Sequence, residues 1–493
     1  MINRQHILPL SIFALALLAA STQGQTTQPA PVDEPASAAA PDEKQQQPKS
    51  TTEKKRAGSK AFGTRLETEP PGYVKSLSEH GETYGIDTLK DLDWFDFGLE
   101  HRTRFEMRRD DYRSGRAAEL PGEDQFLLRS RAYFGVRKIL DPLRFAIEIE
   151  DARQFNSDFA ERADDVNEAD ILQAFVELHF EDALGPGYPL EARAGWMTLE
   201  YMDRRLVGRN RWRSTINAFD GFRLRFGQPS SDWQLDIFAV QPVERRLYHM
   251  DRPDEERWFY GVIGAWRGWS PAIVLEPYYF VLDEDFKDRG ARDRELHTLG
   301  LHGFGLIGDT GLDYDFNTAF QFGADGERDI CAFAAIGEMG YTFKHDWKPR
   351  LSFSTAYASG DRDPNDDQSN RFDRMFGVGH PWSMNDLFDW RNTITPALRI
   401  DFRPHKKVRI DGGYSAHWLA SDSDAWPRVG RRDQAGRSGD FVGQEFDLRV
   451  RFQLDPRVEL ECGYAHFIPG DFVENTGPAD DADFFYVQTV LQF

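Results

Sequence analysis

Cysteine is scarce in this chain of 493 residues, which has only Cys331 and Cys462. Two isolated cysteines form neither a disulfide framework nor the ligand spacing of a zinc site. We expect both to behave as small apolar residues, although the sequence leaves open whether they pair.

Long hydrophobic runs are also missing. After Ala20 no stretch approaches 18 consecutive apolar residues, which excludes a helical inner-membrane protein. The apolar stretch Ile7–Ala20 follows Arg4 and precedes small polar residues, and it is too short to span a membrane as a helix. We interpret residues 1–24 as a secretory signal peptide.

The sequence lacks the motifs of common enzymes. It has no Gly-x-Ser-x-Gly, no His-Glu-x-x-His and no glycine-rich phosphate loop. Asp361–Asp367 is similar to a calcium loop but lacks its Gly and Glu, which favours a solvated turn. A formal charge of −22 disfavours nucleic-acid binding. We therefore predict a protein that is no enzyme and has no cofactor, metal centre or nucleic-acid partner.

The N-terminal region after the signal differs in composition from the rest. Residues 25–60 are rich in Pro, Ala, Gln, Thr and Lys and have few large apolar side chains, which predicts a disordered tether. Residues 61–93 are predicted to be a transitional periplasmic segment. From Trp94 to Phe493 the chain becomes strongly aromatic and charged.

Apolar and polar residues alternate throughout this last region. In Phe126–Val136 most apolar side chains share one face, broken only by Ser130, whereas Leu127, Arg129 and Arg131 share the other, because successive side chains of a strand point to opposite faces. The same division recurs in Phe145–Glu150, Leu172–Phe180, Leu398–Arg403 and Phe446–Phe452. The pattern fits either a soluble sandwich or a membrane barrel whose charges face a wet interior.

Three features favour the membrane barrel. The chain has a signal peptide, and its closing strand Phe484–Phe493 ends on an aromatic residue, like the strands by which outer-membrane barrels are recognised, although an ordinary edge strand remains the alternative. Aromatic residues also lie near predicted strand ends, namely Trp94, Trp258, Trp266, Trp269 and Trp390. At about 9–11 residues per spanning strand plus connections, residues 94–493 predict an all-β fold. It is a single large antiparallel transmembrane β-barrel of about 16–18 strands, wide enough for an aqueous channel.

Several motifs along the barrel resemble those of the alginate export family of outer-membrane barrels. They are Arg205–Gly208, Trp212, Phe219–Arg223, His297–Gly300, Gln321–Gly323, Ser359–Pro364, Trp418–Ala420, Gly443–Asp447 and Gly463–Gly470, in that order. One departure is Gly195–Met197, where the family often has Gly-Arg-Gln. If that arginine binds the polymer, Trp196 in its place weakens the inference that the polymer is alginate.

The resemblance implies a constriction of arginines and acids that binds an anionic polysaccharide. The candidate pore-lining residues are Arg102, Arg104, Arg129, Arg131, Arg205, Arg223, Arg225, Arg449, Arg451, Glu148, Glu445 and Asp447. Guanidinium groups bind carboxylates through charge-assisted hydrogen bonds, and charged rings set the ionic preference of pores. The alternative is that arginines and acids of neighbouring strands pair to stabilise the wall. Arg205 and Arg223 are the best candidates because they lie in the most specific motif.

The predicted function is passive passage of an anionic polysaccharide or oligosaccharide through the outer membrane. A porin-like diffusion channel for small solutes and a closed structural or adhesive barrel are the alternatives. The partners expected are outer-membrane lipid, the anionic polysaccharide or a small anionic solute, and, for export, periplasmic secretion proteins.

Overall fold

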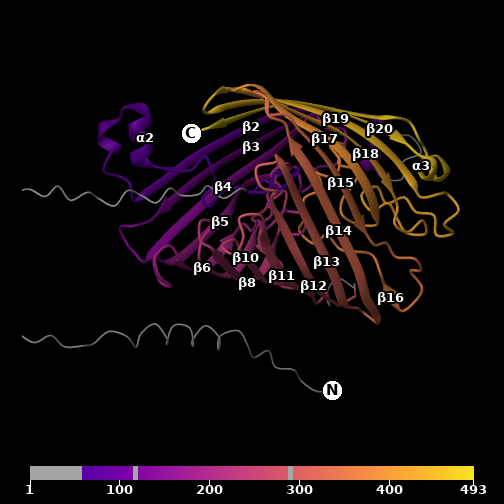
Figure 1. Ribbon diagram of the computed structural model, residues 1–493, viewed down its shortest axis with the longest axis horizontal. Helices are drawn as coiled ribbons and strands as arrows, with labels where there is room; N and C mark the ends of the chain where they lie inside the picture. The colour runs from indigo at the N-terminus through magenta and orange to yellow at the C-terminus, as the bar shows by residue number, and fades with distance from the viewer. Residues whose placement is uncertain (1–57, 115–119, 287–291) are drawn as a thin grey trace, which may run out of the picture. The chain divides into compact units, whose positions relative to one another are not determined.

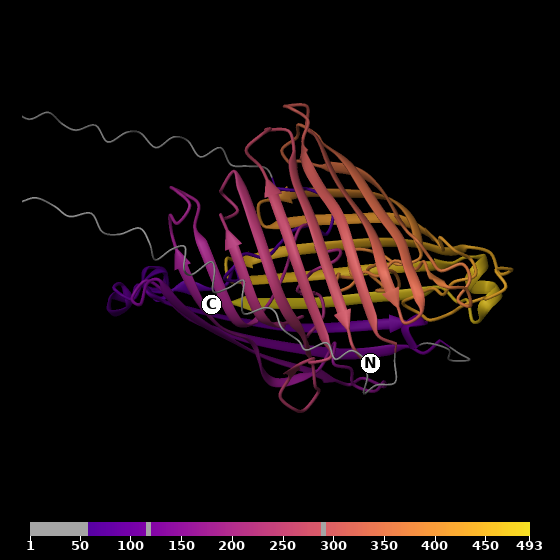
Figure 2. The same cartoon turned by 90° about the horizontal axis from the view of Figure 1, so that it is seen from below.

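In a computed structural model, the chain forms a closed antiparallel β-barrel (Figures 1 and 2). The structure describes residues 58–114, 120–286 and 292–493. The predicted signal peptide and nearly all of the predicted tether lie outside the described residues. No helix within the described ranges is long and apolar enough to cross a membrane.

Eighteen long strands make up the described wall, each antiparallel to its neighbours. They are β2 (Phe95–Arg109), β3 (Glu123–Val136), β4 (Leu143–Phe155), β5 (Asn167–Phe180), β6 (Leu190–Met197), β7 (Phe219–Phe226), β8 (Trp233–Glu244), β10 (Arg257–Trp266), β11 (Val274–Glu284), β12 (Arg294–Leu306), β13 (Leu312–Asp325), β14 (Arg328–Thr342), β15 (Arg350–Ala358), β17 (Thr393–His405), β18 (Val408–Trp418), β19 (Phe441–Asp455), β20 (Val458–Pro469) and β21 (Ala482–Gln492). The last strand, β21, pairs with β2 and closes the barrel. The predicted fold class and strand number are therefore confirmed.

Short elements accompany these strands. They are β1 (Lys75–Ser76), β9 (Arg252–Pro253), β16 (Gln368–Ser369), the helices α2 (Leu77–Tyr84) and α3 (Asp471–Thr476), and two short 3-10 helices, η1 (Asp87–Leu89) and η2 (Tyr112–Ser114). Strand β1 pairs with the start of β2 and so fixes the N-terminal segment to the barrel.

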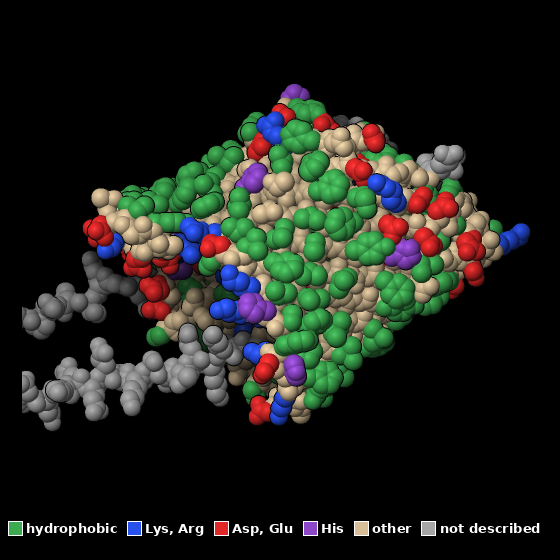
Figure 3. Space-filling view, turned by 90° about the horizontal axis from the view of Figure 1, so that it is seen from above, with side chains coloured by type: hydrophobic (Ala, Val, Ile, Leu, Met, Phe, Trp, Pro, Cys, Tyr) green, Lys and Arg blue, Asp and Glu red, His purple; other side chains and the backbone are tan. Residues whose placement is uncertain are grey.

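The alternation of side chains separates a wet inner face from an apolar outer face. On β3, Leu127, Arg129 and Arg131 are buried inside, whereas Phe126 and Ser130 are exposed outside. Hydrophobic side chains cover a broad area of the outer surface, and charged side chains gather toward its edges (Figure 3). This arrangement fits a barrel in lipid, since a soluble sandwich would bury its apolar face. Both cysteines are free, and Cys331 is exposed on β14.

The two ends of the barrel differ. Short turns such as 137–142, 343–349 and 456–457 join strands at one end, and long connections at 198–218, 359–392 and 419–440 join them at the other. Outer-membrane barrels keep short turns in the periplasm and long loops outside the cell. The end with the short turns, where β2 begins and β21 ends, is therefore the periplasmic end.

The long connections pack inside the barrel. The connections 198–218 and 359–392, here called the first and second inner loops, bury Leu206 and Phe372 in one cluster with Phe219 of β7. Trp390 lies near a strand end, as expected, three residues before β17 begins, but its side chain is fully buried and donates from Nε1 to the Tyr357 oxygen at 3.1 Å. The second inner loop folds back into the barrel, which no local pattern around Trp390 indicates.

Candidate functional site

The N-terminal segment Ser59–Val74, here called the strap, contacts opposite parts of the inner wall. The Ser59 hydroxyl donates to Asp315 of β13 at 2.5 Å, and the Phe62 amide donates to Glu338 of β14 at 3.1 Å. At its other end, the Tyr73 hydroxyl donates to Glu148 of β4. The segment 61–93, which the sequence assigned to the periplasm, therefore begins inside the barrel.

The strap fits closely between the inner loops. Gly63 has φ +79°, and a Cβ atom there would lie 2.5 Å from the Cβ of Pro381 in the second inner loop. Arg204 of the first inner loop donates from Nε to the Gly63 oxygen at 2.8 Å. A glycine is needed here because of both the backbone conformation and the space.

Glu69 of the strap lies in a cluster of three arginines. Arg223 of β7 donates from both terminal nitrogens to the two carboxylate oxygens, at 2.9 and 2.8 Å. Arg193 of β6 and Arg225 of β7 approach the same carboxylate within 3.3 and 3.5 Å. Burial alone would raise the pKa of Glu69, but the three arginines hold it well below its ordinary value. We call Arg193, Arg223 and Arg225 the carboxylate site.

A second strap carboxylate has its own basic neighbours. Glu67 lies 3.3 Å from Arg209 and 3.9 Å from Arg211, both in the first inner loop. Burial opposes ionisation of Glu67, but Arg209, Arg131 and Arg211 lower its pKa below the ordinary value. Its backbone amide also donates to Glu200 at 2.6 Å. Two carboxylates of one extended segment thus meet two adjacent groups of arginines.

Arg205 is paired with acids rather than with the strap. It donates to Asp203 at 2.7 Å and lies 3.9 Å from Asp315. Its neighbours Leu206 and Val207 are completely buried, and Val207 forms a bridge with Phe376 of the second inner loop. In this structure the Arg205–Gly208 motif joins the two inner loops.

Four predicted arginines on β2 and β3 bind the wall or the first inner loop. Arg102 and Arg104 donate to backbone oxygens of that loop, including the Trp212 oxygen at 3.1 and 2.7 Å. Arg129 and Arg131 share the Glu100 carboxylate at 2.8 and 2.7 Å.

The predicted residues on β19 behave in the same way. Arg449 and Arg451 both lie 2.9 Å from Asp411 of β18. Asp447 accepts two hydrogen bonds from Arg399 of β17, at 2.8 and 2.6 Å. Arg449 and Arg451 thus pair with an acid of the neighbouring strand, and Asp447 pairs with an arginine one strand further along the wall.

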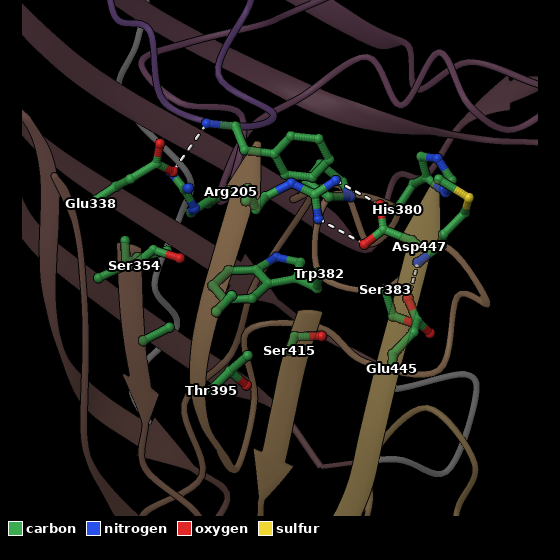
Figure 4. A pocket seen from close by; sticks show the side chains of 17 residues that line it. Arg205, Glu338, Ser354, His380, Trp382, Ser383, Thr395, Ser415, Glu445 and Asp447 are labelled. Atoms are coloured by element: carbon green, nitrogen blue, oxygen red, sulfur yellow. Dashed lines mark hydrogen bonds and ion pairs between the residues drawn. The ribbon is translucent and has the colours of Figure 1, made fainter. Parts of the chain in front are cut away.

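The two remaining predicted acids hold loops and the strap. Glu445 accepts from the Ser383 hydroxyl at 2.6 Å and from the Met384 amide at 2.7 Å, which anchors the second inner loop to the wall (Figure 4). Glu148 is fully buried and lies 3.6 Å from both Arg131 and Arg209.

A cavity of about 50 Å³ lies where strap, second inner loop and wall meet. Figure 4 shows Arg205, Trp382 and Glu445 around it. This volume holds a few water molecules at about 10–15 Å³ each, but no sugar ring.

Two groups of described residues bring acids and a histidine together, Asp203–His302–Asp315 and Glu177–His179–Glu191. Arg205 already supplies positive charge to the first group, and Arg193 lies 2.7 Å from Glu177 in the second. Asp361, from the segment similar to a calcium loop, belongs to neither group. Its carboxylate accepts a hydrogen bond from Arg328 at 2.7 Å. These contacts describe ion-pair networks.

Sequence reasoning missed Glu67, Glu69, Arg193, Arg209 and Arg399. Arg193 was detectable, because Glu191 and Arg193 alternate with Leu190 and Ala192 in a strand. Glu67 and Glu69 lie in a polar stretch without periodicity, so no signal indicated that they enter the barrel.

Comparison with known proteins gives a family and a fold. A model of the family described as alginate export matches residues 93–487. Crystal structures of similar fold include Pseudomonas aeruginosa OccK11 (OpdR), with 14% identity, TM-score 0.54, and coverage of 81% of this chain and 96% of that chain. The outer membrane protein OprD of Pseudomonas aeruginosa has 12% identity, TM-score 0.55, and coverage of 81% and 93%. Acinetobacter baumannii OccAB2 has 10% identity, TM-score 0.56, and coverage of 81% and 98%. No curated protein sequence matches the chain.

Proposed function

The chain belongs to the alginate export family, and from this premise we propose that it passes an anionic polysaccharide or oligosaccharide through the outer membrane. The observation that carries the proposal is the carboxylate site. Arg193, Arg223 and Arg225 converge on one carboxylate inside the barrel, and Arg223 binds it with two parallel hydrogen bonds. This geometry suits the carboxylate of a uronic acid.

The other predicted arginines have a supporting part in the proposal. Those on β2, β3 and β19 are neutralised by acids or hold the first inner loop, so they shape the lumen more than they attract cargo. Arg225 donates hydrogen bonds to Asp236 at 2.9 Å and to Glu191 at 3.5 Å, and it approaches Glu69 only as an ion pair at 3.5 Å. We therefore assign cargo binding first to Arg223, then to Arg193 and Arg225.

Trp196 does not weaken this proposal. It pairs with Ala174 of β5 and Asp220 of β7, in register with the outward residues Val176 and Phe222. The position where the family often has arginine thus faces away from the lumen in this chain. The carboxylate site is built from other positions.

A porin-like channel for small solutes is the second candidate, and the small cavity and the packed inner loops favour it over passage of a bulky polymer. Efflux from liposomes that contain the purified protein separates the two. The cargo channel releases an oligomer of a uronic acid several times faster than a neutral oligosaccharide of the same length. Equal rates would favour the porin, and no release of either would favour a closed structural barrel.

A further inference from the structure

The strap is held inside the barrel by side-chain contacts rather than by a sheet. Within the described residues, sheet pairing with the wall begins only after the strap, at Lys75 opposite Phe97 of β2. Before that point, Phe62 and Glu67 donate their amides to acid side chains, and Arg211 donates to the Arg65 oxygen at 2.8 Å. Such a segment can leave the barrel interior without breaking the backbone hydrogen bonds between the wall strands.

The strap carboxylates occupy the positions that a bound anion would take beside the arginines. Arg223 has only 1% of its side chain exposed, and its ion-pair partner is Glu69, whose side chain is 25% exposed. Without Glu69, Arg193 and Arg225 keep Glu177 and Asp236 as partners, but the buried guanidinium of Arg223 loses its ion pair, which is costly for a buried charge. Whatever replaces Glu69 must therefore bring a negative charge of its own.

The spacing of the two strap carboxylates indicates which kind of ligand can replace the strap at the arginines. Glu67 and Glu69 are two residues apart, a distance of at most about 7 Å along the chain. One meets Arg209 and Arg211, and the other meets the carboxylate site. A ligand that matches both groups is a polymer with a carboxylate on each successive sugar.

We propose that the strap is a tethered anionic ligand that occupies the cargo site and is displaced by a carboxylate-bearing polysaccharide. This inference rests on the proposed function for the identity of the competitor. A tethered ligand acts at a millimolar effective concentration when its linker is short. The strap thus keeps out neutral solutes and isolated small anions, and a multivalent polyanion competes with it successfully.

Displacement is measured at Ala61, which is buried in the strap at 7% exposure. In the full chain with Cys331→Ser and Cys462→Ser, Ala61→Cys provides a single thiol that reacts with a water-soluble methanethiosulfonate. We expect the reaction in reconstituted protein to be slow, to accelerate at least tenfold with an oligouronate, and not to change with a neutral oligosaccharide.

Variants of the strap give a second arm. Glu67→Gln with Glu69→Gln is expected to expose the thiol without any ligand and to raise ion conductance several-fold. Glu82→Gln, an exposed position on α2, is the matched control and is expected to behave as the parent. The oligouronate arm retains both strap acids, so it does not depend on folding of the double variant.

A thiol that reacts at the same rate with and without the oligouronate would overturn the proposal, even if the oligouronate crosses the membrane. If efflux favours the oligouronate but the thiol reactivity does not change, only the proposal about the strap is refuted. A strap that responds to the oligouronate while efflux shows no preference refutes only the proposed cargo channel.

Discussion

The guanidinium of Arg223 on β7 donates two hydrogen bonds to the carboxylate of Glu69, which lies 154 positions earlier in the chain. This contact joins the barrel wall to the N-terminal segment and shows that the wall binds a carboxylate inside the barrel. Arg223 differs in this respect from Arg129 and Arg449, whose acid partners lie on neighbouring wall strands.

Replacing Arg223 is expected to reduce charge discrimination. Arg223→Gln removes the bidentate donor, so oligouronate efflux falls about tenfold relative to efflux of the neutral oligosaccharide. The loss of one charged hydrogen-bonding pair, about 1.5–3 kcal/mol, corresponds to that factor or more. Arg457→Gln, at an exposed turn, is the control and leaves the ratio unchanged. An unchanged ratio in Arg223→Gln would remove this residue from the cargo site.

Arg205 is expected to behave differently from Arg223. Arg205→Gln leaves Asp203, which is buried, without its ion-pair partner at 2.7 Å. Breaking a buried pair costs about 3–5 kcal/mol, so the first inner loop loosens. Proteolysis within residues 198–218 should become faster, with a smaller effect on the efflux ratio than Arg223→Gln. A variant with normal loop protection and a lost efflux preference would instead make Arg205 a cargo residue.

The anchor at Glu445 is expected to control the second inner loop. Glu445→Ala leaves the Ser383 hydroxyl and the Met384 amide without their acceptor, at about 1–3 kcal/mol each. The loop should become sensitive to protease, and ion conductance should rise. Asp455→Ala, an exposed side chain at the end of β19, serves as the control. Unchanged protease resistance and conductance would show that other contacts hold the loop.

The strap is expected to remain bound in mildly acidic solution. Arg223, Arg225 and Arg193 lower the pKa of Glu69 against the effect of burial. A group with a lowered pKa stabilises the bound state above its unfolded value, about 4.3, and loses that contribution only as the pH falls through the lowered value. Conductance should therefore stay constant from pH 8 to pH 5. An increase with a midpoint between pH 5 and pH 7 would contradict the assignment.

The outer face gives a prediction about stability. Leu448 on β19 and Leu140 in the turn 137–142 have the same exposure, 51%, but only Leu448 lies within a spanning strand. Leu448→Arg should cost about 2–4 kcal/mol, whereas Leu140→Arg should cost at most about 1 kcal/mol. Unfolding of the protein in lipid vesicles by denaturant measures both. Equal costs would place Leu448 outside the hydrocarbon layer.

The wall was predictable from the sequence because the alternation of apolar and polar side chains depends only on residues close together in the chain. Alternation in Phe126–Val136 indicates which side chains face inward, and β3 follows that pattern over its whole length. The pairing of Arg129 and Arg131 with Glu100 was anticipated as an alternative, since neighbouring strands place charges side by side.

The filling of the barrel was not predictable in the same way. Trp390 and Glu69 lie in segments without periodicity, and their positions depend on contacts with residues far away in the chain. A polar stretch such as the strap shows its role only when the charges it meets are known. Arg205, one of the two best sequence candidates, lies in a motif that joins the two inner loops in the structure.

Whether the carboxylate site binds cargo is decided by the efflux of an oligouronate compared with that of a neutral oligosaccharide of equal length, measured from the same liposomes. We expect the wild-type protein to release the oligouronate faster and Arg223→Gln to lose that preference. Equal release of the two sugars by folded wild-type protein would contradict this expectation.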